Sequence, residues 1–261
     1  NLPAALDSVC GWASEVYVVD SFSTDRTVDI ALERAAEGVR VVQHKFEDYS
    51  QQWNWALTHL PIRAAWTLKL DADERCTLAF KLEVESQLAG APADVAGVFF
   101  RRRLIFMGTP ISGAGTSDAY VLHLWRTGQA RFEDRAVNEH ALVNGEVVYL
   151  HNTVEHHNTK SLSDWLDKHN RYTSLEALSL IEGNVVGDVS PRLFGRDDQR
   201  RIWLRSMYYR VPCRFAVAMA YFLYRYVWKL GFLDGEAGFH LCFLQVAFRY
   251  ITDLKVCEYR K

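Results

Sequence analysis

The sequence predicts an α/β protein with a mainly parallel sheet, flanking helices and a separate helical C-terminal region. Over residues 1–90, β-branched runs alternate with helical segments, and short strands with Gly-rich turns follow up to residue 150. Helical sequence dominates from about Ser161 onward. Of the 261 residues, 49% are hydrophobic and 24% are charged, which is typical of a globular chain and excludes a disordered or fibrous one.

The elements follow one another with short turns. We expect strands at residues 16–19, 39–42 and 66–70, helices at 27–36, 49–60 and 77–88, and further strands at 97–103, 119–125 and 146–150. The chain starts with a helix signal at Asn1-Leu2-Pro3, whereas an α/β domain commonly opens with a strand. We therefore expect the opening strand to be missing.

The net charge and the cysteine content argue against several classes of protein. The formal net charge of −2 argues against a general nucleic-acid binder, which would be strongly basic. The five cysteines are scattered and form no CxxC pair, so we expect neither a disulfide framework nor a zinc ribbon. A reducing compartment, the cytoplasm, is the expected location.

Asp71-Ala72-Asp73 is the strongest chemical signal. Both carboxylates come just past a buried strand, where open α/β sheets bind ligands, and side chains two apart on an extended segment project together. Paired hard oxygens suit Mg²⁺ or Mn²⁺. The alternative is a polar turn in which Thr77 caps the next helix.

Asp20 ends an earlier strand in the same way. An acid at this place can accept hydrogen bonds from a nucleobase or a ribose. The following Ser23, Thr24 and Asp25 are interpreted as a structural helix cap.

Three stretches in this order, VVDSFSTDRT, QHKFEDYSQQWNWAL and WTLKLDADE, resemble family 2 glycosyltransferases. The closest resemblance is to bacterial enzymes of lipopolysaccharide core and related glycan synthesis. It implies a Rossmann-like GT-A domain over residues 1–180, preceded by an opening strand, and a basic, aromatic helical region over residues 181–261. It also implies a nucleotide-sugar donor, most commonly a UDP-sugar.

The resemblance implies roles for individual residues. Asp20 should contact the base or ribose of the donor, Asn54 should lie beside the nucleotide, and Asp71 should approach the ribose or the metal. Asp73 should bind the metal that bridges the diphosphate. The sequence departs from the family pattern at Trp53, where an Arg is expected, and at Ser21, where many members carry a second Asp.

An inverting transfer needs a general base to deprotonate the acceptor hydroxyl. By resemblance, Glu139 matches the position of a His-Glu or Asn-Glu pair in relatives and is assigned this role, with Glu133 and Asp134 as reserves. The alternative for Glu139 is a solvated turn carboxylate.

Three histidines, His151, His156 and His157, form a further cluster in the sequence. No cysteine or fourth ligand lies at a zinc spacing. By resemblance, His156 is the best match for a metal or diphosphate contact. The alternative for each is a partly buried histidine that bonds to backbone.

The C-terminal region differs in charge from the rest. Residues 190–261 hold 13 Lys and Arg against 6 Asp and Glu, whereas residues 1–189 hold 17 against 26. The apolar runs at 215–224 and 239–247 are too short to span a bilayer, which takes about 20 residues. We expect helices that lie on the inner face of the cell membrane, near a lipid-linked acceptor. The alternative is a helical hairpin packed on the core.

These observations favour an inverting, metal-dependent glycosyltransferase that acts on a saccharide or lipid-linked acceptor. A sugar-phosphate nucleotidyltransferase is the second enzyme class, although the sequence shows no Gly-rich, basic phosphate loop. A membrane-associated scaffold that keeps the fold without turnover is the non-enzyme alternative.

Overall fold

The computed structural model describes residues 1–115, 120–134, 140–158, 161–182, 192–194, 199–200, 203 and 214–260. The chain forms two compact units. Unit 1 comprises residues 1–102 and 120–157, and unit 2 comprises residues 103–119 and 158–261. The sequence suggested one boundary at residue 180, and the extent of the N-terminal domain stays a prediction.

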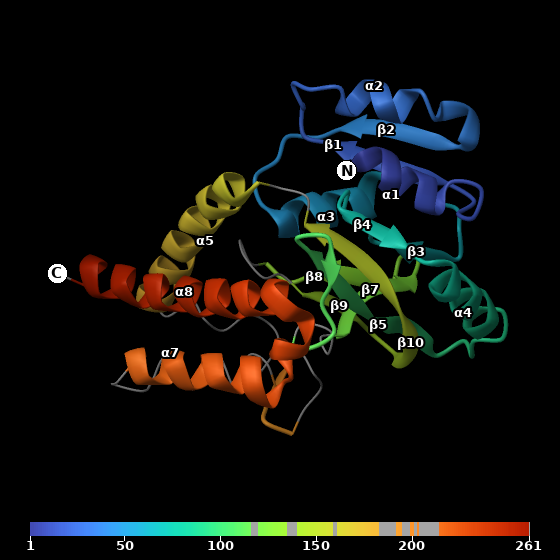
Figure 1. Cartoon of the computed structure of the whole chain (residues 1–261). Helices are drawn as coiled ribbons and strands as arrows, with labels where there is room; N and C mark the ends of the chain where they lie inside the picture. The colour runs from blue at the N-terminus through green and yellow to red at the C-terminus, as the bar shows by residue number, and fades with distance from the viewer. Residues whose placement is uncertain are drawn as a thin grey trace. The chain divides into compact units, whose positions relative to one another are not determined.

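Unit 1 begins with a helix and a pair of parallel strands (Figure 1). The first elements are α1 (Leu2–Val9), β1 (Val16–Asp20), α2 (Thr27–Leu32), the 3₁₀ turn η1 (Ala35–Glu37) and β2 (Val39–Gln43). β1 and β2 pair in parallel, with Val16 opposite Val39. Leu6, Ala31 and Val39 are buried together between the helices and this pair. Both predicted strands are confirmed, and the predicted helix at 27–36 ends earlier, at Leu32.

The rest of unit 1 is built on a larger sheet with the strand order β3-β7-β5-β10-β4. Its strands are β3 (Trp66–Leu68), β4 (Glu74–Cys76), β5 (Val95–Phe106), β7 (Tyr120–Arg126) and β10 (Glu146–Asn158). The other elements are α3 (Tyr49–His59), α4 (Leu78–Leu88) and the short pair β8 (Ala130–Phe132) and β9 (Ala141–Val143).

The expectation of a mainly parallel sheet is corrected by the strand directions. β3 with β7, β5 with β7, and β4 with β10 are all antiparallel, and β1 with β2 is the parallel pair among the registers described. No crossover helix separates β5, β7 and β10 along the described chain. Strands joined without a crossover can return antiparallel, whereas parallel neighbours need one.

The core of unit 1 lies between α4 and the larger sheet. Phe80 from α4 and Phe100 from β5 are fully buried, with their ring centroids 4.9 Å apart in an edge-on contact. Val98, Leu150 and Val154 complete the same cluster from the strands. The core therefore fixes the sheet on which β3 and β4 lie.

A cavity of about 610 Å³ lies between β1 and β3 within unit 1. β1 pairs with β2 and β3 pairs with β7, and no ladder joins β1 to β3 in the described part of the chain. The apolar residues that line the cavity include Leu6, Val9, Val16, Val18, Ala56, Leu68 and Val84. The expected opening strand stays a prediction.

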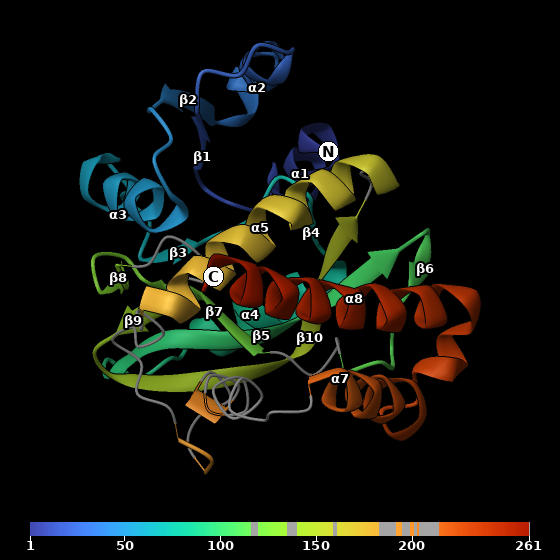
Figure 2. The same cartoon turned by 90° about the vertical axis from the view of Figure 1, so that its left-hand side faces the viewer.

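Unit 2 is mainly helical. Its described elements are β6 (Thr109–Pro110), α5 (Leu162–Glu182), α7 (Arg214–Leu223), the π turn η2 (Tyr224–Trp228), the 3₁₀ turn η3 (Gly231–Asp234) and α8 (Gly235–Tyr259). α8 lies between α5 and α7 (Figure 2). Leu241 and Cys242 of α8 are buried in a cluster with Ile111. Lys255 of α8 donates to the Asn170 carbonyl oxygen of α5 at 2.7 Å.

The C-terminal helices therefore pack on one another. Among the described residues, no helix combines the length and the apolar composition that crossing a bilayer demands. Contact with a membrane surface stays a prediction.

Candidate active site

The two acids of the Asp71-Ala72-Asp73 motif follow β3, as the sequence predicted. The chain turns here instead of staying extended: the Glu74 N–H donates to the Asp71 carbonyl oxygen at 2.8 Å, and the Asp71 N–H donates to Glu74 Oε2 at 3.0 Å. The turn gives the two carboxylates different partners, which differs from the expectation that they project together.

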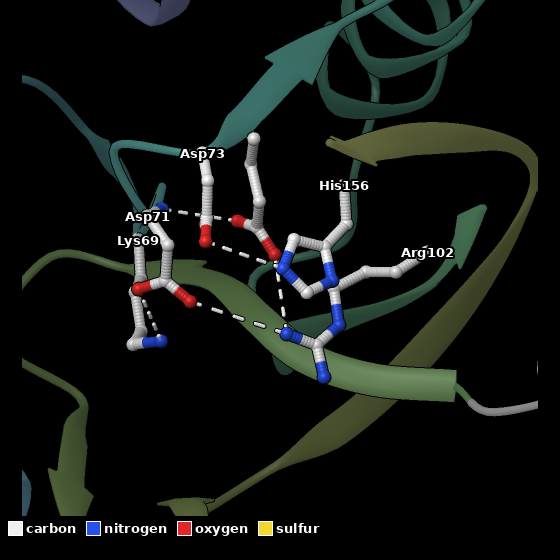
Figure 3. Close-up of polar contacts among 6 residues, drawn as sticks. Lys69, Asp71, Asp73, Arg102 and His156 are labelled. Atoms are coloured by element: carbon white, nitrogen blue, oxygen red, sulfur yellow. Dashed lines mark hydrogen bonds and ion pairs between the residues drawn. The ribbon is translucent and has the colours of Figure 1, made fainter. Parts of the chain in front are cut away.

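Asp71 lies between two cations (Figure 3). Its Oδ1 is 3.0 Å from Lys69 Nζ, and its Oδ2 is 4.0 Å from the Arg102 guanidinium. Arg102 also pairs with Glu74 at 3.2 Å. Glu74 is fully buried, and burial together with the nearby Asp71 charge raises the pKa of its carboxyl group. The acids and cations at this end of the sheet thus form one cluster in which the negative and positive charges partly cancel.

Asp73 meets His156 (Figure 3). Asp73 Oδ2 is 3.3 Å from His156 Nε2, and the backbone N–H of His157 donates to the Asp73 carbonyl oxygen at 2.8 Å. The antiparallel register sets this contact, because His156 of β10 lies opposite Glu74 of β4. Two of the three residues expected at the metal are therefore brought together from distant parts of the sequence, and their metal role stays a prediction.

The other two histidines of the cluster do not join this pair. His157 Nε2 lies 2.9 Å from Glu155 Oε2, and His151 is exposed. In the described part of the chain, no three His, Cys, Asp or Glu side chains converge as a preformed metal site. The Asp73 carboxylate is the kind of ligand that Mg²⁺ and Mn²⁺ take, whereas an imidazole is a softer ligand, and such an ion keeps water and substrate phosphate oxygens as further ligands.

Lys69, which the sequence motifs did not single out, is the most buried cation of the cluster. Its side chain is 5% exposed, and its Nζ lies 4.8 Å from the centroid of the Trp53 ring on α3. A cation over an aromatic face is stabilised by the ring quadrupole. Trp53, which departs from the family pattern, therefore supports a positive charge beside Asp71. The sequence feature that could have identified Lys69 is a lysine within an apolar run, two residues before Asp71.

His123 is a second residue that sequence reasoning missed. Val98 of β5 faces Leu124 and Phe99 faces Leu122, so the register shift leaves His123 of β7 without an opposite residue. A bulge of this kind re-aims a side chain and is common beside active sites. Its buried Nδ1 makes no hydrogen bond with the described residues. Burial, together with the charges of Lys69 and Arg102, lowers the pKa of His123 well below its usual value.

Asp20 is buried at the end of β1 and has a local structural role. Its carboxylate accepts hydrogen bonds from the Ser23 N–H at 3.1 Å and from Gln43 Nε2 at 2.9 Å. Burial opposes ionisation, but the bonds from Gln43 and Ser23 outweigh it and lower the pKa of the Asp20 carboxyl group. The carboxylate is charged and holds the turn after β1, and its contact with a donor stays a prediction.

Asn54 of α3 holds β8 in place. Its Nδ2 donates to the Phe132 carbonyl oxygen at 3.0 Å, and its Oδ1 accepts the Phe132 N–H at 2.8 Å. Ser50, one turn earlier, donates to the Glu133 carbonyl oxygen at 2.6 Å. In this arrangement the Asn54 amide positions the segment that carries the proposed general bases, and the predicted place beside the nucleotide stays a prediction.

The three acids proposed as general bases differ in their surroundings. Glu133 is fully buried, and its Oε1 accepts the His140 N–H at 3.1 Å and contacts the His140 ring. The Glu133 N–H donates to the His140 carbonyl oxygen at 3.1 Å. Asp134 is exposed. Glu139 lies outside the described residues.

The comparisons with known proteins agree with this architecture. The sequence model named Glycosyl transferase family 2 matches residues 1–132, just over half of the chain. The chain belongs to this family. A similar solved structure is the mannosyltransferase PcManGT from Pyrobaculum calidifontis in complex with GDP-Man and Mn²⁺. The two structures superpose with a TM-score of 0.56 at 14% sequence identity, over 100% of this chain and 84% of that chain.

At this low identity the superposition shows the fold, and the predicted GT-A fold of this family 2 glycosyltransferase is confirmed. The family match covers the two strand-end acids at Asp20 and Asp71, together with Asp73 and Asn54. The individual site assignments stay predictions, because neither comparison tests a residue.

Proposed function

We propose that this protein is an inverting glycosyltransferase that moves a sugar from a nucleotide-diphosphate sugar to a saccharide or lipid-linked acceptor in lipopolysaccharide or cell-surface glycan synthesis. The observation that carries the proposal is the contact of Asp73 with His156 at 3.3 Å, beside the Asp71 turn. Family membership supports the reaction class, and the spatial pairing of these two residues supports a divalent ion at the donor diphosphate.

Asp73 and His156 would hold the metal, and Mg²⁺ or Mn²⁺ bound there would offset the charge of the departing diphosphate. Asp71 is the less direct ligand, because Lys69 already occupies its Oδ1 at 3.0 Å. Lys69 and Arg102 add two positive charges at the same end of the sheet. Fixed cations that face developing negative charge stabilise a transition state in a site that excludes water.

The proposed base is Glu139. It takes the proton of the acceptor hydroxyl while the hydroxyl oxygen bonds to the anomeric carbon and the bond from that carbon to the diphosphate breaks. Glu133 is less suited, because its carboxylate is buried and already accepts the His140 N–H. Exposed Asp134 remains the reserve.

A UDP-sugar is the first donor to test, as the resemblance implied. GDP-mannose is the second, because the similar solved structure is a mannosyltransferase bound to GDP-Man and Mn²⁺. We place the protein in the cytoplasm, peripheral on the inner face of the cell membrane, where a lipid-linked acceptor would be within reach.

The test is a panel of nucleotide sugars with the full chain, scored for release of nucleoside diphosphate with Mn²⁺, with Mg²⁺ and with chelator. Metal-dependent release from one donor supports the proposal. Formation of pyrophosphate from a nucleoside triphosphate and a sugar phosphate would instead identify a nucleotidyltransferase. Metal-dependent nucleotide binding without turnover on any acceptor of a saccharide and lipid-linked panel would favour the non-catalytic scaffold.

A further inference from the structure

The outward side of α7 carries an apolar stripe. Phe215 is 62% exposed, and Met219, Leu223 and Val227 are each about half exposed at successive intervals of four residues. Residues four apart lie on one side of a helix, so these side chains form a continuous line from α7 into η2. At a rise of about 1.5 Å per residue, the line is about 18 Å long.

The stripe leads into an apolar tip formed by residues 228–233. Trp228 is 79% exposed and Leu233 is 69% exposed, and Leu230 and Phe232 are each about half exposed. Single exposed apolar residues are ordinary on soluble proteins, whereas a contiguous set of this kind marks a contact surface.

The tip is held in a defined shape. The Asp234 carboxylate accepts the N–H groups of Ser112 and Gly113 at 3.0 and 2.9 Å, and the Lys229 carbonyl oxygen accepts the Ala114 N–H at 3.0 Å. The apolar side chains of the tip are therefore displayed by a backbone that is anchored within unit 2.

The opposite side of α7 is already covered. Ala218 is buried, and buried Arg225 donates to the Tyr221 hydroxyl at 2.9 Å. Phe222 packs against the cluster that contains Leu241 of α8. The covered side of α7 is thus occupied within unit 2, and the apolar stripe lies on the side that is left exposed.

The sequence just before α7 favours a membrane surface as the partner of the apolar stripe. Residues 192–214 contain seven arginines and two aspartates. Basic segments next to an apolar surface are attracted to anionic lipid headgroups. Trp228 and Tyr224 at the end of the stripe are side chains that favour the boundary between headgroups and acyl chains.

We propose that the stripe and the tip, residues 215–233, are the face with which this protein docks on an anionic bilayer. The helix lies in the plane of the surface, with Trp228 and Leu233 inserted below the headgroups. The proposal names the residues that would place this protein at the membrane, and it builds on the location given under the proposed function. Its test does not use transferase activity, so its failure can be told apart from failure of the proposed reaction.

The test is co-sedimentation of the full chain with vesicles of phosphatidylcholine alone or of phosphatidylcholine with 25% phosphatidylglycerol. We expect binding to the anionic vesicles that weakens as NaCl is raised but is not abolished, because buried apolar surface is less sensitive to salt than charge. Trp228→Ser with Leu233→Ser should weaken this binding at least tenfold.

A matched control replaces two exposed leucines of α4 in unit 1, Leu78→Ser with Leu82→Ser, which are 72% and 57% exposed. It should bind like the unchanged protein. If the tip variant melts at a lower temperature, Phe215→Ser with Met219→Ser tests the same face from the stripe.

Equal sedimentation of the tip, stripe and control variants would overturn the proposal. So would a protein that does not bind vesicles but forms dimers, measured by light scattering, that the tip substitutions dissociate. In that case the face is an interface between copies of the chain.

Discussion

Asp73 Oδ2 and His156 Nε2 lie 3.3 Å apart, although the turn before β4 and the strand β10 that carry them are distant in the sequence. The pairing register of these strands, in which His156 faces Glu74, brings the imidazole to the carboxylate. An ion held by this pair would connect the protein to the diphosphate of a donor.

Asp73→Asn and His156→Ala should each remove the Mn²⁺-dependent part of nucleotide affinity. We expect a loss of at least about tenfold, since even partners of metal ligands contribute 10–100-fold to metal affinity. Titration calorimetry with UDP and GDP, with and without Mn²⁺, measures this loss. His151→Ala is the control, because His151 is exposed on the same strand. Unchanged Mn²⁺ dependence in both variants would exclude the metal role.

Lys69→Met should weaken nucleoside diphosphate binding about tenfold, even in the presence of chelator. The substitution keeps an apolar chain of similar length over Trp53 but removes the charge that lies 3.0 Å from Asp71. Lys81→Met is the matched control, because Lys81 also lies over a tryptophan ring, that of Trp12. Equal affinities of the two variants would mean that Lys69 serves only to neutralise Asp71.

The sequence was sufficient to locate the strand-end acids. β-branched runs that stop at Asp20 and Asp71 place those residues at the ends of β1 and just after β3, because this pattern depends on local order along the chain. Family resemblance added His156, whose contact with Asp73 no local pattern predicts.

The partners of these acids could not be predicted in the same way. Lys69 follows β3, whereas Arg102 and His123 lie in β5 and β7. The antiparallel pairing of β7 with β3 and β5 brings the three together. The alternating strand and helix pattern at the start of the chain favoured a mainly parallel sheet. Strand direction is set by the connections and by tertiary packing, which hydropathy does not report.

Glu139→Gln should lower kcat by about 10²–10⁴ while donor affinity stays unchanged, which is the usual contribution of a general base. Steady-state kinetics with a fixed acceptor and calorimetry with the donor separate the two effects. Wild-type turnover in this variant would move the role to Asp134 or Glu133, and loss of donor binding would make Glu139 structural.

Glu133→Gln should act mainly on stability. The buried carboxylate accepts the His140 N–H. An amide there either turns its NH₂ group towards that donor or keeps its oxygen there and puts a buried NH₂ group in place of the second carboxylate oxygen. We expect the free energy of unfolding to fall by about 1–3 kcal/mol, the cost of an unsatisfied buried polar group. Urea unfolding measures it. A fully stable variant with a hundredfold lower kcat would show that Glu133 takes part in proton transfer.

Asn54→Ala should lower kcat more than it changes the KM for the donor. It removes both bonds to Phe132 and so releases the segment that precedes the proposed bases. The loss of two hydrogen bonds should also cost about 1–3 kcal/mol of stability. Thr58→Ala on the same helix is the control, since its exposed hydroxyl bonds locally, to the Asn54 carbonyl oxygen. A raised donor KM with unchanged kcat would instead support direct contact with the nucleotide.

His123→Phe should make the protein less sensitive to acid. Burial and the nearby Lys69 and Arg102 charges lower the pKa of His123 in the folded state well below its unfolded value, which is about 6.5. Between these two pKa values the unfolded chain binds a proton at His123 and the folded chain does not, so stability falls as the pH falls below 6.5. One such group contributes at most about 1.4 kcal/mol per pH unit to this slope. Urea unfolding of both proteins from pH 7 to pH 5 should therefore give a steeper loss for the histidine protein. The two curves would run parallel if His123 were protonated equally in the folded and unfolded states, and its place beside the cations would then have no electrostatic consequence.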